Sequence, residues 1–122
     1  MSALTFTLKQ ATAQRIDLSP LVCQNLQDLS AAEIAAIELQ NGKSRRRVDE
    51  LFAISGSDGQ NIVIANSNDK LDFIGKDLAC GSITVNGDAG AYLGLGMKAG
   101  SITVNGNVGI YAACELKNGL IE

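Results

Sequence analysis

The chain has 122 residues, of which 46% are hydrophobic and 19% are charged. Ten basic and thirteen acidic side chains give a net charge of −3, which excludes the basic surface that a nucleic-acid partner requires. No apolar run approaches the roughly 18 residues of a membrane span, and no secretory pattern is present, so we expect one compact cytoplasmic domain without a membrane or nucleic-acid partner.

The first part of the chain predicts a small α/β unit. Apolar and polar side chains alternate over residues 3–9, which is typical of a half-exposed strand. Ser30 and Glu33 form a capping box, and they predict a helix over about residues 31–40. Residues 47–55 predict a second strand. We therefore expect an α/β cap with one helix over residues 1–58.

Three adjacent arginines, Arg45, Arg46 and Arg47, form the main charge run of the chain. A solvated strand entry is one explanation. The alternative is a contact with an anion or an acidic partner, because neighbouring guanidinium groups on a strand alternate faces and can present two cations together. We therefore treat these residues as a candidate partner or anion site.

The second part of the chain repeats every nineteen residues. One copy runs from Gly81 to Ala99, the next from Gly100 to Asn118, and a third begins at Gly119. A fixed short period is typical of a solenoid, in which each unit buries its apolar side against its neighbours. The predicted fold is thus mainly β, a right-handed parallel β-helix of about 19 residues per rung over residues 59–122.

Stacking the repeats predicts columns of equivalent side chains. The first column is Ile62, Ile83, Ile102 and Ile121; the second is Ile64, Val85 and Val104; an aromatic ladder is Phe73, Tyr92 and Tyr111. Asn86 and Asn105 are expected to hydrogen-bond to each other through their side-chain amides.

The repeat is also rich in glycine, at positions Gly81, Gly87, Gly90, Gly94, Gly96, Gly100, Gly106 and Gly109. A phosphate-binding loop requires a helix that opens at its glycines, whereas a strand follows here. Glycines at these positions are better explained by sharp turns and by close approach of a neighbouring backbone.

The residue inventory indicates no catalytic centre. The chain has no histidine, so the commonest general base and metal ligand is missing. Cys23, Cys80 and Cys114 are odd in number and widely spaced, which favours reduced, buried cysteines over a disulfide framework. The acids Asp58, Asp69, Asp72 and Asp77 flank predicted turns. We therefore predict no catalytic, metal or cofactor site on this chain.

The repeat from Gly81 to Gly109 resembles the GxGxG β-helix domain shared by the C subunit of formylmethanofuran dehydrogenase and the C-terminal domain of the glutamate synthase large subunit. Residues 42–56 before the repeat resemble the C subunits of the formyl-transfer complexes more closely. The resemblance covers residues 42–122 well and residues 1–41 loosely.

This resemblance implies a noncatalytic scaffold subunit. In such complexes an amidohydrolase-like subunit hydrolyses formyl groups with metals, and a formyltransferase-like subunit moves them between tetrahydromethanopterin and a methanofuran-type carrier. Both subunits are then expected partners of this chain. Frequent Asn and Gln residues are typical of a mesophile and favour the bacterial formyltransferase/hydrolase complex.

Two alternatives remain at this point. The chain could be a subunit of formylmethanofuran dehydrogenase proper, or a stand-alone structural solenoid that forms a homo-oligomer through its open end. The sequence ends at Glu122, just inside a predicted strand, and an open sheet edge favours pairing with another chain. The identity of the carrier and the stoichiometry do not follow from the residues.

Overall fold

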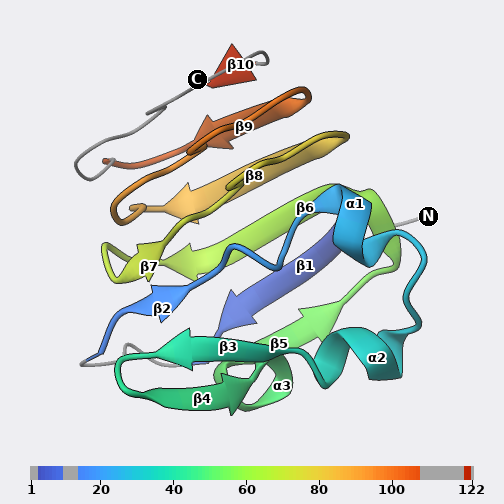
Figure 1. Ribbon diagram of the computed structural model, residues 1–122, viewed down its shortest axis with the longest axis vertical. Coiled ribbons are helices and arrows are strands. Elements are labelled where there is room, and N and C mark those ends of the chain that lie inside the picture. Colours follow the sequence, from blue (N-terminus) through green and yellow to red (C-terminus); the bar gives the residue numbers. More distant parts are fainter. Residues whose placement is uncertain (1–2, 10–13, 108–119, 122) are drawn as a thin grey trace.

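The computed structural model describes residues 3–9, 14–107 and 120–121. Its described strands form two sheets, accompanied by three short helices (Figure 1). The strands of the six-stranded sheet lie in the order β10 (Leu120–Ile121), β9 (Ser101–Val104), β8 (Ser82–Gly87), β6 (Asp58–Ser67), β1 (Ala3–Leu8) and β5 (Phe52–Ser55). The strands of the four-stranded sheet lie in the order β4 (Ser44–Arg47), β3 (Glu38–Asn41), β2 (Ile16–Asp17) and β7 (Leu71–Asp72). The helices are α1 (Cys23–Leu26), α2 (Ala31–Ala35) and α3 (Val48–Leu51).

The fold class predicted from the repeat is wrong: the chain is a small α/β fold with two mixed sheets, and not a right-handed parallel β-helix. In the larger sheet β1 pairs in parallel with β6 but antiparallel with β5. In the smaller sheet β3 pairs antiparallel with both of its neighbours, β2 and β4. The repeat spans only part of the chain, and antiparallel segments from the N-terminal part complete both sheets. Between the paired strands of the repeat, residues 74–77 and 91–96 form turns.

The register predicted between repeats is confirmed. β6, β8 and β9 pair in parallel, with Ile62 opposite Ile83 and Ile83 opposite Ile102. β10 continues this register on β9, with Ile121 opposite Ile102. In-register parallel pairing follows because equivalent side chains one repeat apart must occupy the same side of the sheet.

The predicted ladders are confirmed where the structure describes them. The rings of Phe73 and Tyr92 are stacked, with centroids 5.2 Å apart and planes 4° from parallel. The side-chain amide of Asn105 donates a hydrogen bond to Asn86 Oδ1 at 2.8 Å. Tyr111 lies outside the described residues.

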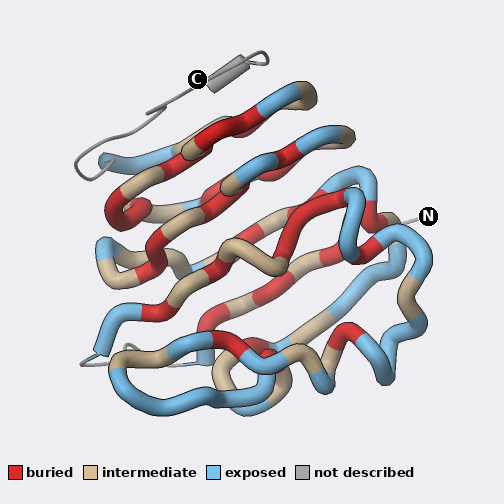
Figure 2. The backbone as a smooth tube through the Cα atoms, in the orientation of Figure 1, coloured by how far each residue is buried: buried red, intermediate tan, exposed pale blue. Residues whose placement is uncertain are grey.

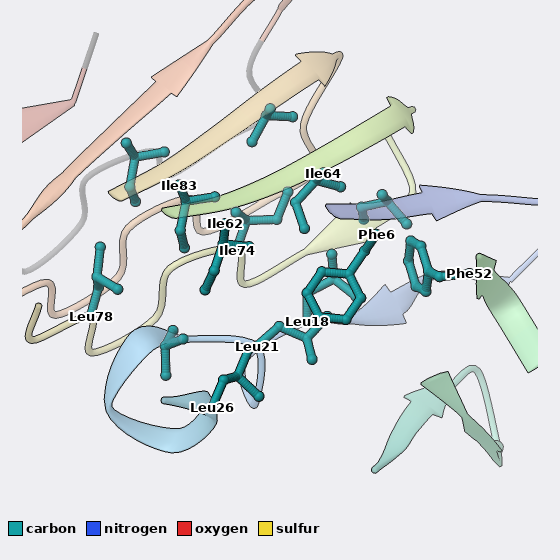
Figure 3. Close-up of a cluster of buried hydrophobic side chains, with 14 of the residues drawn as sticks. Phe6, Leu18, Leu21, Leu26, Phe52, Ile62, Ile64, Ile74, Leu78 and Ile83 are labelled. Carbon is teal, nitrogen blue, oxygen red and sulfur yellow. The ribbon is translucent and has the colours of Figure 1, made fainter. Parts of the chain in front are cut away.

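One hydrophobic core joins the two parts of the chain (Figures 2 and 3). Figure 3 shows Leu18, Leu21 and Leu26 from the N-terminal part in the same cluster as Ile62 and Ile74 from the second part. At the far end of the core, Phe6 and Phe52 make an edge-to-face contact with centroids 6.3 Å apart. The predicted division between residues 1–58 and 59–122 falls where β6 begins, within this shared core, and it remains a prediction.

The N-terminal elements follow the sequence pattern in part. β1 forms as predicted, with its apolar side chains buried. The capping box is present: the Glu33 backbone N–H donates to Ser30 Oγ at 3.2 Å, and the Ser30 N–H donates to Glu33 Oε1 at 3.0 Å. The hydrogen bond from the Ser30 backbone N–H is the larger cause that lowers the pKa of the Glu33 carboxyl, and the Ser30 side chain is the second.

Two predicted boundaries are wrong in this region. The predicted helix over 31–40 ends at Ala35, because Leu39 is drawn into the core as part of the strand β3. The predicted strand over 47–55 is interrupted by α3, whose first turn contains two acidic residues. The Arg47 N–H donates to Glu50 Oε1 at 3.2 Å at this helix start.

The prediction that the cysteines stay reduced is wrong for Cys23 and Cys80, which form a disulfide across 57 positions of sequence. This bond joins α1 to the segment before β8. Gln24 makes a parallel connection, since its side chain donates to the Asp77 carbonyl at 2.7 Å and accepts from the Ala79 N–H at 3.1 Å. The sequence separation hid this pairing, because the two segments meet only in the folded chain. Cys114 lies outside the described residues.

Among the described residues, no helix is long and apolar enough to cross a membrane.

Candidate interaction surface

The three arginines singled out by the sequence lie on β4, an edge strand of the four-stranded sheet. All three are exposed. Arg45 lies opposite Gln40 and Arg47 lies opposite Glu38, so these two arginines share one face. Arg46 lies opposite the buried Leu39 and is on the other face.

Two of these arginines have acidic partners nearby in the chain. Arg46 Nη1 lies 3.8 Å from Glu50 Oε2, and Arg47 contacts Asp49 through two hydrogen bonds of 3.1 Å. All four side chains are about half exposed. Exposed ion pairs of this kind contribute little to stability, but they neutralise the two arginines locally.

Arg45 has no ion pair within the part of the chain that the structure describes. It therefore presents an open guanidinium at a sheet edge, on an exposed hairpin. A guanidinium group is suited to two-point binding of a carboxylate or another planar anion. Of the three arginines predicted as a candidate partner or anion contact, Arg46 and Arg47 are thus paired within the chain and Arg45 is open among the described residues; the contact itself stays a prediction.

The repeat glycines mark places where the next backbone passes too close for a side chain. A Cβ atom at Gly81 would clash with the Gln60 carbonyl, and one at Gly100 would lie 2.5 Å from the Gly81 carbonyl oxygen. Both residues have positive φ angles, 68° and 83°. Side chains are therefore excluded at these positions by both the local conformation and the neighbouring repeat.

The other repeat glycines are placed as follows. Gly87 and Gly106 lie against the carbonyls of Ser67 and Gly87, Gly90 lies against Asp72, and Gly96 has Asp77 Oδ1 2.6 Å from where its Cβ would be. The Gly94 N–H donates a hydrogen bond to the Ile74 carbonyl at 2.8 Å, which joins the turn that contains Gly94 to the turn of the preceding repeat. Gly109 lies outside the described residues.

A buried acid that the sequence placed only near a turn, Asp72, connects three segments. Its Oδ1 accepts a hydrogen bond from the Ala91 N–H at 2.8 Å, and its Oδ2 lies 3.4 Å from Arg15 Nε. Arg15 also donates to the Asp69 carbonyl at 2.9 Å. The contact with Ala91 spans one repeat, so the nineteen-residue period was the signal that could have identified it.

The partly exposed acid Asp58 organises the start of β6. It accepts hydrogen bonds from the Asn61 side chain at 2.6 Å and from the Gln60 N–H at 3.0 Å. These bonds lower the pKa of the Asp58 carboxyl, with Asn61 as the larger cause. Within residues 3–9, 14–107 and 120–121, no group of three Cys, Asp or Glu side chains is arranged to hold a metal ion.

Sequence comparison relates the chain to subunits of formyl-metabolising enzymes. It is 36% identical over 94 residues to the C subunit of tungsten-containing formylmethanofuran dehydrogenase 2 from Methanococcus maripaludis, covering 75% of this chain and 35% of that protein. It is 35% identical over 86 residues to the C subunit of the formyltransferase/hydrolase complex of Methylorubrum extorquens, covering 70% of this chain and 32% of that protein. No family model matches the chain.

Structural comparison leads to one of the same enzyme complexes. The fold superimposes on a chain in the crystal structure of the Methylorubrum extorquens formyltransferase/hydrolase complex with methylofuran, with a TM-score of 0.89 and 33% sequence identity. The match covers 96% of this chain and 44% of that chain. The homologues of this protein are therefore subunits of enzyme complexes, and the chain spans about a third of the length of the curated relatives it matches.

Proposed function

We propose that the chain acts as a noncatalytic scaffold subunit of a cytoplasmic complex that transfers and hydrolyses formyl groups between tetrahydromethanopterin and a methanofuran-type carrier. The observation that carries this proposal is the structural match over 96% of the chain to a member of such a complex. In this proposal the chain itself binds no cofactor. Its partners are an amidohydrolase-like and a formyltransferase-like subunit, which supply the chemistry.

The arrangement of the side chains supports a binding role. Asp72, the buried acid of the described core, is engaged by the Ala91 N–H and by Arg15, and therefore acts as a connection within the fold. Arg45 is an open cation on an exposed edge, which is suited to a contact with an acidic partner. A scaffold requires a rigid framework and contact surfaces. The connection at Asp72 contributes to the framework, and Arg45 provides a contact surface.

A second candidate is a subunit of formylmethanofuran dehydrogenase proper. It is favoured by the 36% identity to the C subunit of that enzyme over 75% of this chain. A third candidate, a structural protein without an enzyme partner, would leave the chain as a homo-oligomer.

The scaffold proposal is tested by activity measurements on the purified chain and on the reconstituted complex. We expect no formyl transfer or hydrolysis by the chain alone. We expect both activities when it is combined with the two partner subunits, and lower activity when it is omitted. Turnover by the purified chain, free of other subunits, would contradict the proposal. Copurification of a redox subunit with the chain from its native cell, and formylmethanofuran oxidation by that complex with an added electron acceptor, would favour the dehydrogenase.

A further inference from the structure

Apart from Asp58, which begins β6 opposite Ala3, the outer face of the six-stranded sheet carries no charged residue from β5 to β9 among the described residues. We call it the neutral face. It consists of Ala3, Thr5, Thr7, Ala53, Ser55, Asn61, Val63, Ala65, Ser82, Thr84, Asn86, Ser101 and Thr103, all exposed or partly exposed. Figure 2 shows the alternation of buried and partly exposed positions along these strands.

The strand register makes this face continuous. Thr5, Val63, Thr84 and Thr103 lie side by side on four successive strands, with Ser55 next to Thr5 at the end of the row. Their side chains are small or β-branched, so the face is flat and has no large protrusion. Flat sheet faces pack closely against other flat surfaces.

The lack of charge is local to this face. On the exposed hairpin of the other sheet, neighbouring strand positions carry Glu38, Arg45 and Arg47. Solvent-facing surfaces ordinarily have about a quarter to a third of their positions charged. Depletion of charge, by contrast, is the compositional signature of the centre of a protein–protein interface.

Some of the polar side chains on the neutral face are hydrogen-bonded within the chain. Thr5 Oγ1 donates to the Ala3 carbonyl at 3.2 Å, and Ser82 Oγ donates to Asn61 Oδ1 at 3.0 Å. Polar groups that lose contact with water without another hydrogen-bond partner are the main cost of burying polar surface. Groups that are already hydrogen-bonded within the chain avoid part of this cost when a partner covers them.

The charges nearest the rim are also engaged. Lys9, which follows β1, donates to the Asp49 carbonyl at 2.7 Å. Asp58, at the start of β6, accepts from Asn61 at 2.6 Å. The charged groups at the edge of the neutral face therefore already have hydrogen-bond partners within the chain.

The size of the face indicates what kind of partner fits. Five strands about 4.8 Å apart, each contributing a few residues at about 3.3 Å, cover roughly 300 Å². Stable interfaces bury about 800 Å² on each partner, so any partner on this face must also contact neighbouring surfaces of this chain. The structural match to a chain of a multisubunit complex favours an unlike subunit as that partner.

We propose that the neutral face is the docking surface for an unlike subunit of the complex, which contacts it through an uncharged, flat surface. This inference rests on the proposed function and adds to it the surface by which the chain is held. Arg45 lies on the other sheet, so the two contacts are separable by mutation.

The experiment co-expresses the tagged full chain with the formyltransferase-like and amidohydrolase-like subunits and quantifies the subunits that copurify. Thr84→Glu places a charge near the centre of the face, and Thr84→Val keeps the shape without charge. Ala36→Glu places the same charge at an exposed site after α2, on another part of the surface. Thermal unfolding of each isolated variant reports folding, and Thr5→Glu repeats the test on another strand if Thr84→Glu is unfolded.

We expect Thr84→Glu to reduce copurified partner by about tenfold or more, because an unpaired charge would be buried in the contact. Thr84→Val and Ala36→Glu should retain the parent level. Copurification by Thr84→Glu at the parent level would overturn the inference while leaving the proposed function intact. A homodimer of the parent that Thr84→Glu dissociates would also overturn it, in favour of a second copy. If the parent and Ala36→Glu also fail to capture the subunits, the proposed function fails, and the docking inference fails with it.

Discussion

At the scale of single residues, Ile102 shows how one repeat depends on another. It is fully buried and pairs in register with Ile83. Its Cδ1 atom occupies the space where Gly75 lacks a side chain, so a larger residue at position 75 would collide with it. The next residue toward the N-terminus, Ser101, lies on the outer side of the same strand and is partly exposed.

We predict that Ile102→Ala lowers the free energy of unfolding by about 2 to 5 kcal/mol, because it removes buried methyl groups and leaves a cavity. Ser101→Ala should change it by about 0.5 kcal/mol or less, since the side chain lies on the outer side of the strand. Chemical denaturation of both variants measures the difference. Equal losses would show that the assignment of buried and exposed sides is wrong.

At the scale of elements, β4 presents its arginines unequally. Arg46 and Arg47 are paired with Glu50 and Asp49 on the following helix α3, whereas Arg45 has no such partner among the described residues. The edge strand therefore offers one cation for an external contact. The acids two and four positions downstream are visible in the sequence, and their spacing is the signal that predicts local pairing.

We predict that Arg45→Ser weakens assembly with the proposed partner subunits about 1.4- to fivefold at low salt, the effect of losing an exposed ion pair worth about 0.2 to 1 kcal/mol. The difference should shrink above about 0.1 M salt, where exposed charges are screened beyond roughly 10 Å. Lys98→Ser removes the same charge from an exposed position on the repeat and serves as the control. If Arg45→Ser binds the partner subunits as tightly as the parent at low salt, β4 is a solvated edge strand and Arg45 makes no partner contact.

The short helix α1 is held to the repeat by the disulfide between Cys23 and Cys80. We predict that Cys80→Ser lowers the free energy of unfolding by about 4 kcal/mol, the loop-closure entropy for a separation of 57 residues. Reducing agent should shift the denaturation midpoint of the parent but not that of Cys80→Ser. A parent midpoint that is unchanged by reductant would show that the bond contributes nothing to stability.

At the scale of the whole molecule, periodic and local features were predictable from the sequence, whereas pairings between distant, unlike segments were not. The register of Ile62, Ile83 and Ile102 follows from a period in which like residues must stack. The capping box at Ser30 is a local signal and was also predictable. Both depend on spacing within one segment or one repeat.

The pairings between unlike segments required the folded chain. Nothing in the period indicates that β5 pairs antiparallel with β1, and this pairing is part of what makes the fold a mixed α/β structure instead of a β-helix. The same holds for the disulfide and for the connection between Asp72 and Arg15. The neutral face was likewise hidden, because its residues come from five strands that are brought together only by their register.

The central claim, membership in a formyl-metabolising complex, is tested most directly by purifying the tagged chain from its native cell and measuring subunit stoichiometry by mass spectrometry. The account predicts that two further proteins, one amidohydrolase-like and one formyltransferase-like, copurify in fixed, near-integral ratio to the chain and remain with it through size-exclusion chromatography. Recovery of the chain alone, as a monomer or as a homo-oligomer, would contradict the account.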